Sequence, residues 1–389
     1  MPAKILVVDD EPDLEQIIVQ KFRKQIRENV FQFTFAKNGV EALERLAEDD
    51  AIELILTDIN MPEMDGLTLL NKIKELENPL FRSVIVSAYG DIDNIRTAMN
   101  RGAFDFVVKP IDLNDLEITI NKSLRDLEIL KDAVRSRDQL TVINHELSIA
   151  TEIQTSILPK TFPAFPDRKE FDIYAKMTPA RQVGGDLYDF FLIDKNRIGL
   201  IIGDVSGKGI PAAMFMAVSK TLLKATALKG ISSDTCLGIV NEILVEESLP
   251  TMFVTVFYGI FDTRSGAFEY SSGGHNPPYL ISHDGNVKQL ENKGGLFLGG
   301  VKNIEYESNM IMLQPGDTLF LYTDGVTEAM NPNDDLFEEH RLEKSLQAHH
   351  QLALEPLVQQ VFKDVEEFSQ GADQSDDITC LAMRFVGKK

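Results

Sequence analysis

Five aspartates beyond residue 180 stand where a carboxylate can be held rigidly and remain accessible. Asp204 ends an apolar run and precedes a glycine-rich loop, and Asp324 stands where another apolar run enters a turn. Taken singly, each Gly-Asp pair is also typical of an ordinary turn. Several such carboxylates meeting in space would bind hard divalent cations, and a pair of cations can direct water against a phosphate ester. The candidate acids are Asp186, Asp204, Asp324, Asp376 and Asp377.

A second group of polar residues near the beginning of the chain follows a series of short apolar runs. Asp9 and Asp10 end the first run, and Asp58 ends the third. Ser87 and Lys109 end the fourth and the fifth. The carboxyl ends of parallel strands share one edge of a doubly wound sheet, so these side chains would converge on one crevice. They suit a magnesium ion and a phosphoryl group, with Asp58 as the nucleophile that forms an acyl phosphate. The alternative is a flavodoxin-like domain with ordinary surface acids.

The first third of the chain alternates strand and helix signals, which predicts a parallel sheet covered by helices on both faces. The apolar runs that predict strands are residues 5–8, 31–36, 54–57, 84–86 and 106–108. The amphipathic stretches that predict helices are residues 14–26, 40–46, 67–76 and 92–99. We therefore expect an α/β doubly wound domain over residues 1–122.

A long helical segment follows this domain. Residues 113–158 contain no proline or glycine, and apolar residues recur there in two heptad phases separated by the charged residues 135–138. The phases comprise Leu113, Leu116, Ile120, Leu127, Leu130 and Val134, and then Leu140, Ile143, Leu147, Ala150 and Ile157. We predict a coiled-coil linker over residues 123–158 that pairs with its copy in a homodimer. The alternative is an amphipathic helix packed on its own domains.

The rest of the chain, residues 159–389, is rich in strand signals. The expected strands are residues 171–177, 190–193, 198–203, 252–261, 267–271, 278–281, 318–322 and 378–383. The expected helices are residues 212–228, 234–247 and 356–367. Antiparallel sheets with helices outside would fit this order, so we expect an α+β domain built as a layered β-sandwich.

Composition and charge exclude several classes of partner. The chain has 389 residues, enough for two or three domains, and a formal net charge of -22, which would repel a nucleic-acid backbone. Its two cysteines give no disulfide framework and no metal-ligand spacing. The beginning of the chain has no signal-peptide pattern, and no apolar stretch is long enough to span a membrane. We therefore expect a cytoplasmic protein with neither nucleic acid nor membrane as a direct partner.

The first constellation resembles the receiver domain of two-component response regulators, over the whole of residues 1–122. The resemblance implies that Mg²⁺ binds the acidic pair Asp9 and Asp10, the phosphoacceptor Asp58 and the backbone carbonyl of Asn60. It also implies a sensor histidine kinase or phosphotransfer protein as phosphodonor. Ser87, Phe106 and Lys109 would be the switch residues. By residue type alone, Phe106 is a core residue rather than a switch.

The second constellation resembles the metal-dependent Ser/Thr protein phosphatases of the SpoIIE type, from about residue 150 onward. It includes residues 149–159, which look like the entry helix of that branch. The resemblance implies two Mn²⁺ or Mg²⁺ ions and a phosphoserine or phosphothreonine substrate, on a protein such as an anti-sigma-factor antagonist. The implied catalytic and metal-binding residues are Asp204, which would bridge the two ions, the backbone carbonyl of Val205 on one ion, and Asp324 and Asp376 on the other. Asp186 would be an outer or second-site ligand, and Asp377 would lie behind the ligands. Which of Asp376 and Asp377 touches metal stays open. His275 and Asn276 match a family motif and are expected to hold a turn.

Together the two resemblances imply a response regulator in which phosphorylation of Asp58 controls protein phosphatase activity. The alternative is a catalytically silent adaptor that sequesters a regulatory protein when phosphorylated. Retention of the complete acid set disfavours the adaptor. A DNA-binding response regulator would need a basic recognition helix, which the second half of the chain lacks.

Overall fold

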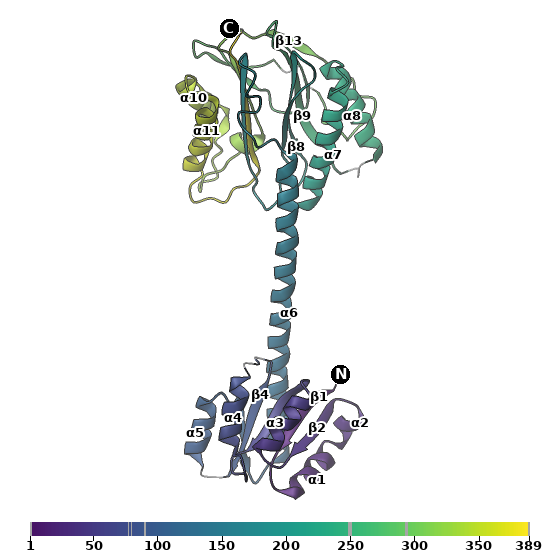
Figure 1. The fold of residues 1–389 in the computed structure, drawn as a ribbon, viewed down its shortest axis with the longest axis vertical. Helices are drawn as coiled ribbons and strands as arrows, with labels where there is room; N and C mark the ends of the chain where they lie inside the picture. The colour runs from purple at the N-terminus through teal and green to yellow at the C-terminus, as the bar shows by residue number, and fades with distance from the viewer. Residues whose placement is uncertain are drawn as a thin grey trace. The chain divides into compact units, whose positions relative to one another are not determined.

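The computed structural model describes residues 2–76, 78, 80–88, 91–247, 251–291 and 295–387. The chain divides into two compact units, Met1–Ile143 and Asn144–Lys389, and we describe each separately. One long helix, α6 (Leu113–Ile157), contributes residues to both units (Figure 1). None of the described helices is long and apolar enough to cross a membrane.

The first unit contains a five-stranded parallel sheet with the order β2-β1-β3-β4-β5. The strands are β1 (Ala3–Val8), β2 (Phe31–Ala36), β3 (Ile52–Asp58), β4 (Arg82–Ala88) and β5 (Asp105–Lys109). The helices other than α6 are α1 (Pro12–Lys21), α2 (Arg23–Arg27), α3 (Gly39–Glu48), α4 (Gly66–Glu75) and α5 (Ile92–Asn100). The central strands are apolar at successive positions because helices cover both faces of the sheet. The predicted doubly wound fold is confirmed.

Two hydrophobic clusters show which helices cover each face of this sheet. On one face, Ile18 of α1 and Ile120 of α6 pack with Val7 and Leu56. On the other face, residues of α3 and α4 pack with a separate set of strand residues. The first part of α6 therefore belongs to the core of the first unit.

The second unit contains two five-stranded antiparallel sheets, with the orders β13-β10-β9-β8-β7 and β12-β11-β14-β15-β6. The strands are β6 (Phe171–Thr178), β7 (Leu187–Leu192), β8 (Arg197–Val205), β9 (Val254–Asp262), β10 (Ala267–Gly273), β11 (Tyr279–Ile281), β12 (Val287–Gln289), β13 (Asn309–Met312), β14 (Thr318–Tyr322) and β15 (Ile378–Phe385). The helices are α7 (Ile210–Ala227), α8 (Ser233–Glu247), α9 (Asp324–Thr327), α10 (Glu338–His349) and α11 (Leu354–Phe368). The sheets pack face to face, with α7 and α8 outside the first and α10 and α11 outside the second (Figure 1).

Strand β15 explains why both faces of these sheets are apolar. Leu381 and Met383 enter the core between the sheets, whereas Cys380 and Ala382 face the outer helices. Successive side chains of a strand point to opposite faces, so a strand in a four-layer arrangement must be apolar at every position. The predicted layered β-sandwich is confirmed. Cys380 and the other cysteine, Cys236 on α8, are both buried and unpaired.

Helix α6 changes its surroundings along its length. Leu116, Ile120 and Leu127 of the first heptad phase are buried in the first unit. Leu140 and Ile143 of the second phase are exposed. The helix continues without a break through residues 135–138, the charged stretch between the two phases. Half of the heptad pattern is therefore satisfied by the helix's own domain, as the alternative interpretation expected.

Candidate functional site

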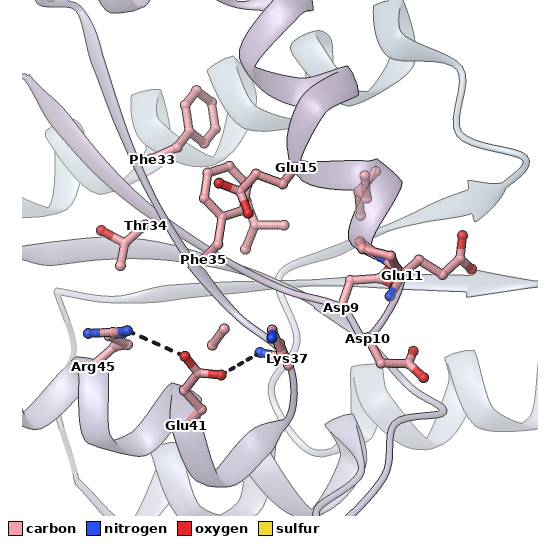
Figure 2. Close-up of a pocket in the computed structure, with 14 residues that line it drawn as sticks. Asp9, Asp10, Glu11, Glu15, Phe33, Thr34, Phe35, Lys37, Glu41 and Arg45 are labelled. Carbon is pink, nitrogen blue, oxygen red and sulfur yellow. Dashed lines mark hydrogen bonds and ion pairs between the residues drawn. The ribbon is translucent and has the colours of Figure 1, made fainter.

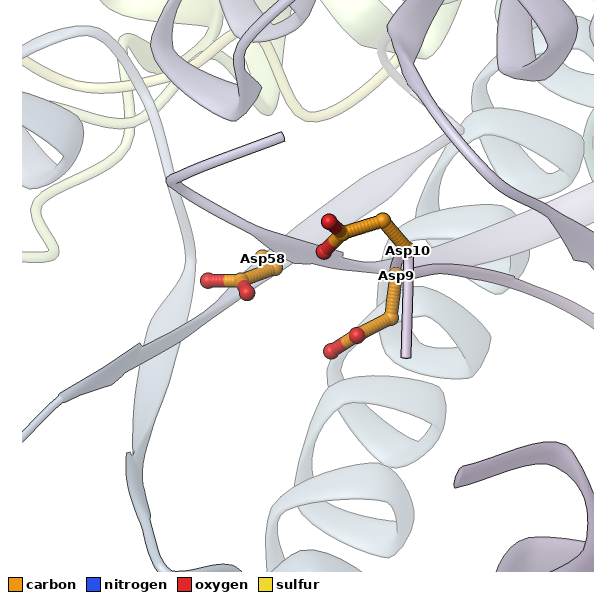
Figure 3. Close-up of side chains that lie close together, drawn as sticks. All are labelled: Asp9, Asp10 and Asp58. Carbon is orange, nitrogen blue, oxygen red and sulfur yellow. The ribbon is translucent and has the colours of Figure 1, made fainter. Parts of the chain in front are cut away.

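The parallel sheet of the first unit gathers three carboxylates at one edge. Asp9 and Asp10 follow β1, and Asp58 is the last residue of the neighbouring strand β3. One oxygen of each lies within 4.8 Å of the others, and Figure 3 shows the three side chains close together at this edge. Oxygen ligands this close together fit a hard divalent cation such as Mg²⁺.

Lys109 supplies the positive charge of this cluster. Its Nζ atom lies 2.8 Å from Oδ2 of Asp58, 2.9 Å from Oδ2 of Asp9 and 3.0 Å from Oε1 of Glu11. Burial lowers the pKa of Lys109, but the hydrogen bonds to these three carboxylates outweigh it and leave the pKa above its usual value. Burial also raises the pKa of Asp9, against the opposing effect of Lys109. The ammonium is therefore permanently charged and stands beside the carboxylate of Asp58.

The remaining predicted residues of the first unit surround this cluster. Ser87 on β4 is buried, and its hydroxyl lies 3.5 Å from Oδ2 of Asp91. The amide of Asn60, two residues after Asp58, lies 3.4 Å from Oδ1 of that carboxylate. Phe106 on β5 is 40% exposed, so it is not the core residue that its type alone suggests.

A groove of about 770 Å³ opens beside Asp9 and Asp10. Figure 2 shows Phe33 and Phe35 of β2 on its wall, with Asp9 and Asp10 at one end. Glu41 stands on another side, where it accepts hydrogen bonds from Arg45 and the amide of Lys37. Asp9 and Asp10 are thus accessible from this groove, whereas Asp58 is buried beside them.

In the second unit, the register of the first sheet brings two predicted acids together. Leu187 of β7 pairs with Gly203 of β8 in an antiparallel arrangement. Asp186, directly before β7, and Asp204, near the end of β8, therefore lie at the same end of the sheet. The two strands are neighbours, so these carboxylates are adjacent in space although seventeen positions separate them in the chain.

The second sheet brings its acids to the matching end of the sandwich. Tyr322 of β14 pairs with Cys380 of β15, so Asp324, which begins α9, lies near Asp376 and Asp377. Hydrogen bonds from Thr323 and Thr379 to Asp186 join the two groups. The structure thus gathers all five predicted aspartates at one end of the sandwich.

Asp186 is the most buried of the acids and forms the connection between the sheets. Its Oδ2 accepts a hydrogen bond from Thr323, with the hydroxyl 2.8 Å away, and another from Thr379. Burial, then the nearby charges of Asp204 and Asp377, raise its pKa well above the usual value, and the two threonines partly oppose this shift. A side chain of the first sheet is therefore anchored on the second.

Asp204 and Asp324 have similarly perturbed titration. Burial, followed by the charges of Asp324 and Asp376, raises the pKa of Asp204 to about 7. Burial, then Glu328 and Asp376, raises the pKa of Asp324 to about 6. Crowded, buried carboxylates of this kind are costly to ionise without a compensating cation. This donor set fits the hard divalent ions that the sequence predicts.

The acids are less tightly gathered here than in the first unit. Among the residues that the structure describes, only Asp9, Asp10 and Asp58 have three acid oxygens all within 4.8 Å of one another. One cation lies nearby, since Nζ of Lys208 is 2.9 Å from Oδ2 of Asp376. The carbonyl of Val205 faces Gly185, where an added Cβ would lie 2.9 Å from that oxygen.

Asp376 and Asp377 have different surroundings. Asp377 is buried, and its oxygens accept hydrogen bonds from the amides of Ala180 (2.8 Å), Gly185 (2.6 Å) and Asp186 (3.3 Å). The side chain of Asp376 is 35% exposed and bonds to Lys208 and to the amide of Asp377. Asp377 thus holds the loop that carries Asp186, whereas Asp376 faces the space between the acids and solvent.

Sequence reasoning missed contacts that organise this end of the sandwich. His275, expected to hold a turn, exchanges hydrogen bonds with Ser272 three residues earlier, and its ring also connects the two sheets. Its Nδ1 lies 2.9 Å from the hydroxyl of Thr255, and its Nε2 lies 3.1 Å from the carbonyl of Tyr322. Burial lowers the pKa of His275 to about 4, so the ring is neutral. The Gly-Gly-His-Asn motif signalled this residue, but its partners could not be read from the sequence.

Both units match known families. Residues 5–121 match the response regulator receiver domain, and residues 194–386 match the family described as Stage II sporulation protein E (SpoIIE). The second match includes Asp204, Asp324 and Asp376 but begins after Asp186. The chain is 32% identical to the phosphoserine phosphatase RsbU of Bacillus subtilis over 62% of its own length and 70% of RsbU. The chain is a response regulator with a SpoIIE-type phosphatase domain.

Two further relatives agree with this assignment. The response regulator is 29% identical to protein IcfG of Synechocystis sp. over 69% of its own length but only 48% of IcfG, so it spans about half of that relative. The solved SiaA-PP2C domain of Pseudomonas aeruginosa superimposes with a TM-score of 0.54 and 23% identity, covering 64% of this chain and 98% of that domain. The latter likeness identifies the fold of the second unit as that of a PP2C domain.

Proposed function

We propose that phosphorylation of Asp58 in this response regulator controls the metal-dependent hydrolysis of phosphoserine or phosphothreonine on a partner protein. The crowding of Asp186, Asp204 and Asp324, with pKa values raised by burial and mutual repulsion, carries the proposal. Such carboxylates are typical of a site that hard cations complete. The RsbU relative, a phosphoserine phosphatase, supports the choice of substrate class.

The acids would have distinct tasks in this reaction. Asp204 would hold both Mn²⁺ or Mg²⁺ ions, with the Val205 carbonyl and Asp186 beside it and Asp324 and Asp376 on the other side. When bound, the ions lower the pKa of a water molecule and stabilise charge on the phosphoryl oxygens. Hydroxyl groups of two threonines keep the inner carboxylate oriented, which fixes the geometry before the substrate arrives.

The receiver would supply the control. An oxygen of Asp58 would attack the phosphorus of a phosphohistidine on a sensor kinase or phosphotransfer protein, forming the acyl phosphate as the bond from phosphorus to the imidazole nitrogen breaks. Asp9, Asp10 and the Asn60 carbonyl would hold Mg²⁺ with it. Lys109, 2.8 Å from Asp58, would bind the transferred phosphoryl group. Ser87 and Phe106 would respond to it, and α6 and α7 would carry the change to the Asp204 loop.

An anti-sigma-factor antagonist is the substrate we propose, by analogy with the SpoIIE-type relatives. The test is phosphate release from a phosphoserine form of such a protein encoded in the same genome. A matched phosphothreonine protein from outside this class serves as the control. Equal turnover of both would argue against the specific substrate while leaving the phosphatase intact.

The activity itself is tested with p-nitrophenyl phosphate and Mn²⁺. We expect the wild-type protein to release phosphate. The rate of release should be lower by at least about a thousandfold in Asp204→Ala, because the bridging carboxylate is removed. Lys344→Ala, an exposed change on α10, is the matched control and should keep the wild-type rate. Equal rates for wild type and Asp204→Ala would leave the silent adaptor as the better interpretation.

The control by Asp58 requires a separate experiment. Beryllofluoride, an acyl-phosphate mimic, should change the turnover of the wild-type protein by about tenfold and have no effect on Asp58→Asn. The turnover of Asp58→Asn should equal that of the untreated wild-type protein. A response that persists in Asp58→Asn would contradict receiver control.

We further propose a homodimer through the exposed part of α6. Leu140 and Ile143 of the second heptad phase are exposed on this helix, at 60% and 51% of their surface, and exposed apolar residues at heptad positions favour pairing with a second copy. Sedimentation of the full chain should give a dimer, and Leu140→Glu together with Ile143→Glu should give a monomer. A wild-type monomer at about 50 μM would contradict this proposal.

A further inference from the structure

Gln154, near the end of α6, makes a paired contact with the loop that precedes β7. Its side chain is buried, with 6% of the residue exposed. The Nε2 atom donates to the carbonyl of Gly184 at 2.5 Å, and Oε1 accepts from the Gly184 amide at 3.0 Å. One side-chain amide thus satisfies both backbone groups of a single glycine, as a neighbouring strand would. One turn earlier, the hydroxyl of Thr151 lies 2.7 Å from the carbonyl of Gln182.

The same loop is held from its other side by Asp377. The carboxylate accepts from the amides of Ala180 and Gly185, which flank Gly184 in the loop. A Cβ atom on Gly184 would lie 2.3 Å from Oδ2 of Asp377, so any side chain there would displace that carboxylate. The loop therefore has little freedom between the helix and the carboxylate.

Asp186 stands two residues beyond this contact. Its carboxylate is fixed by Thr323 and Thr379 of the second sheet, next to Asp204. A movement of the loop must either carry Asp186 with it or break those hydrogen bonds. Because hydrogen bonds weaken steeply with distance and angle, a shift of about 1 Å at Gly184 would be felt at the acids.

We propose that Gln154 is a positioning residue through which the end of α6 sets the place of Asp186 in the acid cluster. The inference rests on the proposed phosphatase function and names the contact by which α6 would act on that site. A rotation of the last turns of α6 would remove both hydrogen bonds at once and leave a buried amide without partners, so the contact would switch between a made and a broken state. Receiver control would operate by favouring one of these states.

Hydrogen exchange of the full chain without metal is the first test. Gln154→Met keeps the length and volume of the side chain but cannot bond to Gly184. We expect the peptide containing residues 182–186 to exchange about tenfold faster in this variant, because the Gly184 amide loses its acceptor. Gln139→Ala, an exposed glutamine on the same helix, should leave that peptide unchanged. Thermal unfolding of each variant verifies that the second unit remains folded.

Mn²⁺ binding, measured by electron paramagnetic resonance of the free ion, is the second test. We expect Gln154→Met to weaken binding by about tenfold, the effect of losing the geometry that two hydrogen bonds maintain. Gln154→Glu, which keeps the acceptor for the Gly184 amide but loses the donor, should fall between this variant and wild type. Thr151→Val, which removes only the contact to Gln182, should weaken Mn²⁺ binding by about two- to threefold. It carries the test if Gln154→Met does not fold.

The outcomes separate this inference from the proposed function. Wild-type exchange or wild-type Mn²⁺ binding in Gln154→Met would overturn the positioning role. A full response of this variant to beryllofluoride would overturn its part in receiver control. If the wild-type protein itself hydrolyses no phosphate ester, the proposed function fails, and the exchange and Mn²⁺ measurements still decide whether Gln154 positions Asp186.

Discussion

The two units each gather acids at the end of a sheet, but they neutralise them differently. In the receiver, Lys109 lies within 3.0 Å of Asp9, Glu11 and Asp58, so a protein cation is built into the cluster. In the phosphatase domain, Lys208 bonds to the outermost acid, Asp376. The inner carboxylates face one another instead.

The difference indicates which site depends on metal for its stability as well as its chemistry. A carboxylate next to an ammonium can remain ionised without an added ion, whereas crowded buried carboxylates take up protons or bind divalent cations. We therefore expect the stability of the receiver domain not to depend on bound metal. At neutral pH, repulsion among its carboxylates should destabilise the phosphatase domain until divalent cations bind.

The largest expected effect separates the two clusters by activity. Asp324→Asn should lower Mn²⁺-dependent phosphate release by at least about a thousandfold, because a cation ligand is lost. Asp9→Asn should leave the unstimulated rate within about twofold, since it touches only the receiver. Release of phosphate from p-nitrophenyl phosphate measures both. Equal losses in the two variants would mean that the clusters do not work independently.

Asp376 and Asp377 should differ in stability rather than in activity alone. Asp377→Asn replaces an acceptor oxygen with a donor facing backbone amides, so we expect a loss of about 3 kcal/mol in the free energy of unfolding. Asp376→Asn removes a partly exposed ion pair and should cost less than about 1 kcal/mol, while weakening Mn²⁺ binding. Urea unfolding without metal measures the difference. If Asp376→Asn were the less stable variant, the assignment of the two roles would be reversed.

The metal-free phosphatase domain should lose stability as the pH rises from 5 to 7.5. The pKa of Asp204 is raised to about 7 and that of Asp324 to about 6, both above the unfolded value of 3.8. The folded state therefore retains protons that the unfolded state has released, and stability falls as the pH passes through these values. We expect Tm to drop by about 5 °C or more in chelator.

Two controls sharpen this pH experiment. Mn²⁺ should restore Tm more strongly at pH 7.5 than at pH 5, because ionised carboxylates bind it. Asp204→Asn should reduce the change of Tm with pH in the metal-free protein. Acids with a lowered pKa, such as Asp194 at about 2, are already ionised in this window and contribute no slope. A Tm that rises between pH 5 and 7.5 in chelator would contradict the described electrostatics.

The smallest expected effect concerns the link between the sheets. His275→Gln should cost about 1–2 kcal/mol, because Thr255 and the Tyr322 carbonyl lose a buried partner. Since the pKa of His275 is lowered to about 4, its ring should contribute no inflection to the activity profile between pH 5.5 and 8. Urea unfolding and a pH–rate profile check the two statements. An inflection that disappears in His275→Gln would show that the ring titrates there.

Much of the receiver could be predicted from the sequence because its strands are short, continuous apolar runs. The run at residues 31–36 coincides with β2, and Asp58 and Lys109 do end their strands. In a parallel sheet the order of elements fixes which ends converge. Two signals were misleading. The aromatic ring of Phe106 favours burial by its type although it lies at the surface, and the amphipathic stretch 14–26, predicted as one helix, forms the two helices α1 and α2.

The phosphatase domain was predicted less completely. Helix α10 (Glu338–His349) was missed because little more than Leu342 and Leu346 is buried on it. Strands β12 and β13 were missed because they have only three and four residues, none fully buried. The identities of the acids could be read from their motifs, but not the register that joins Asp186 to Thr323 and Thr379. Antiparallel pairing between distant segments leaves no local trace in a sequence.

Gln154 and the first heptad phase illustrate the same limit. A glutamine in a long polar helix looks like any solvated residue, and its partner Gly184 lies thirty residues away. Leu116 and Ile120 match a coiled-coil seam and equally match a helix that packs on its own sheet. Only the tertiary structure distinguishes the two.

The burial of both cysteines has a practical consequence. Burial raises the pKa of Cys236 to about 12 and that of Cys380 still further, and both side chains are inaccessible. Thiol reagents react with the thiolate, so the folded protein should resist them without any engineering. A cysteine introduced at the exposed position 139 would then be the single label-reactive site. A nitroxide attached there would report the distance between two copies of the chain by dipolar electron paramagnetic resonance.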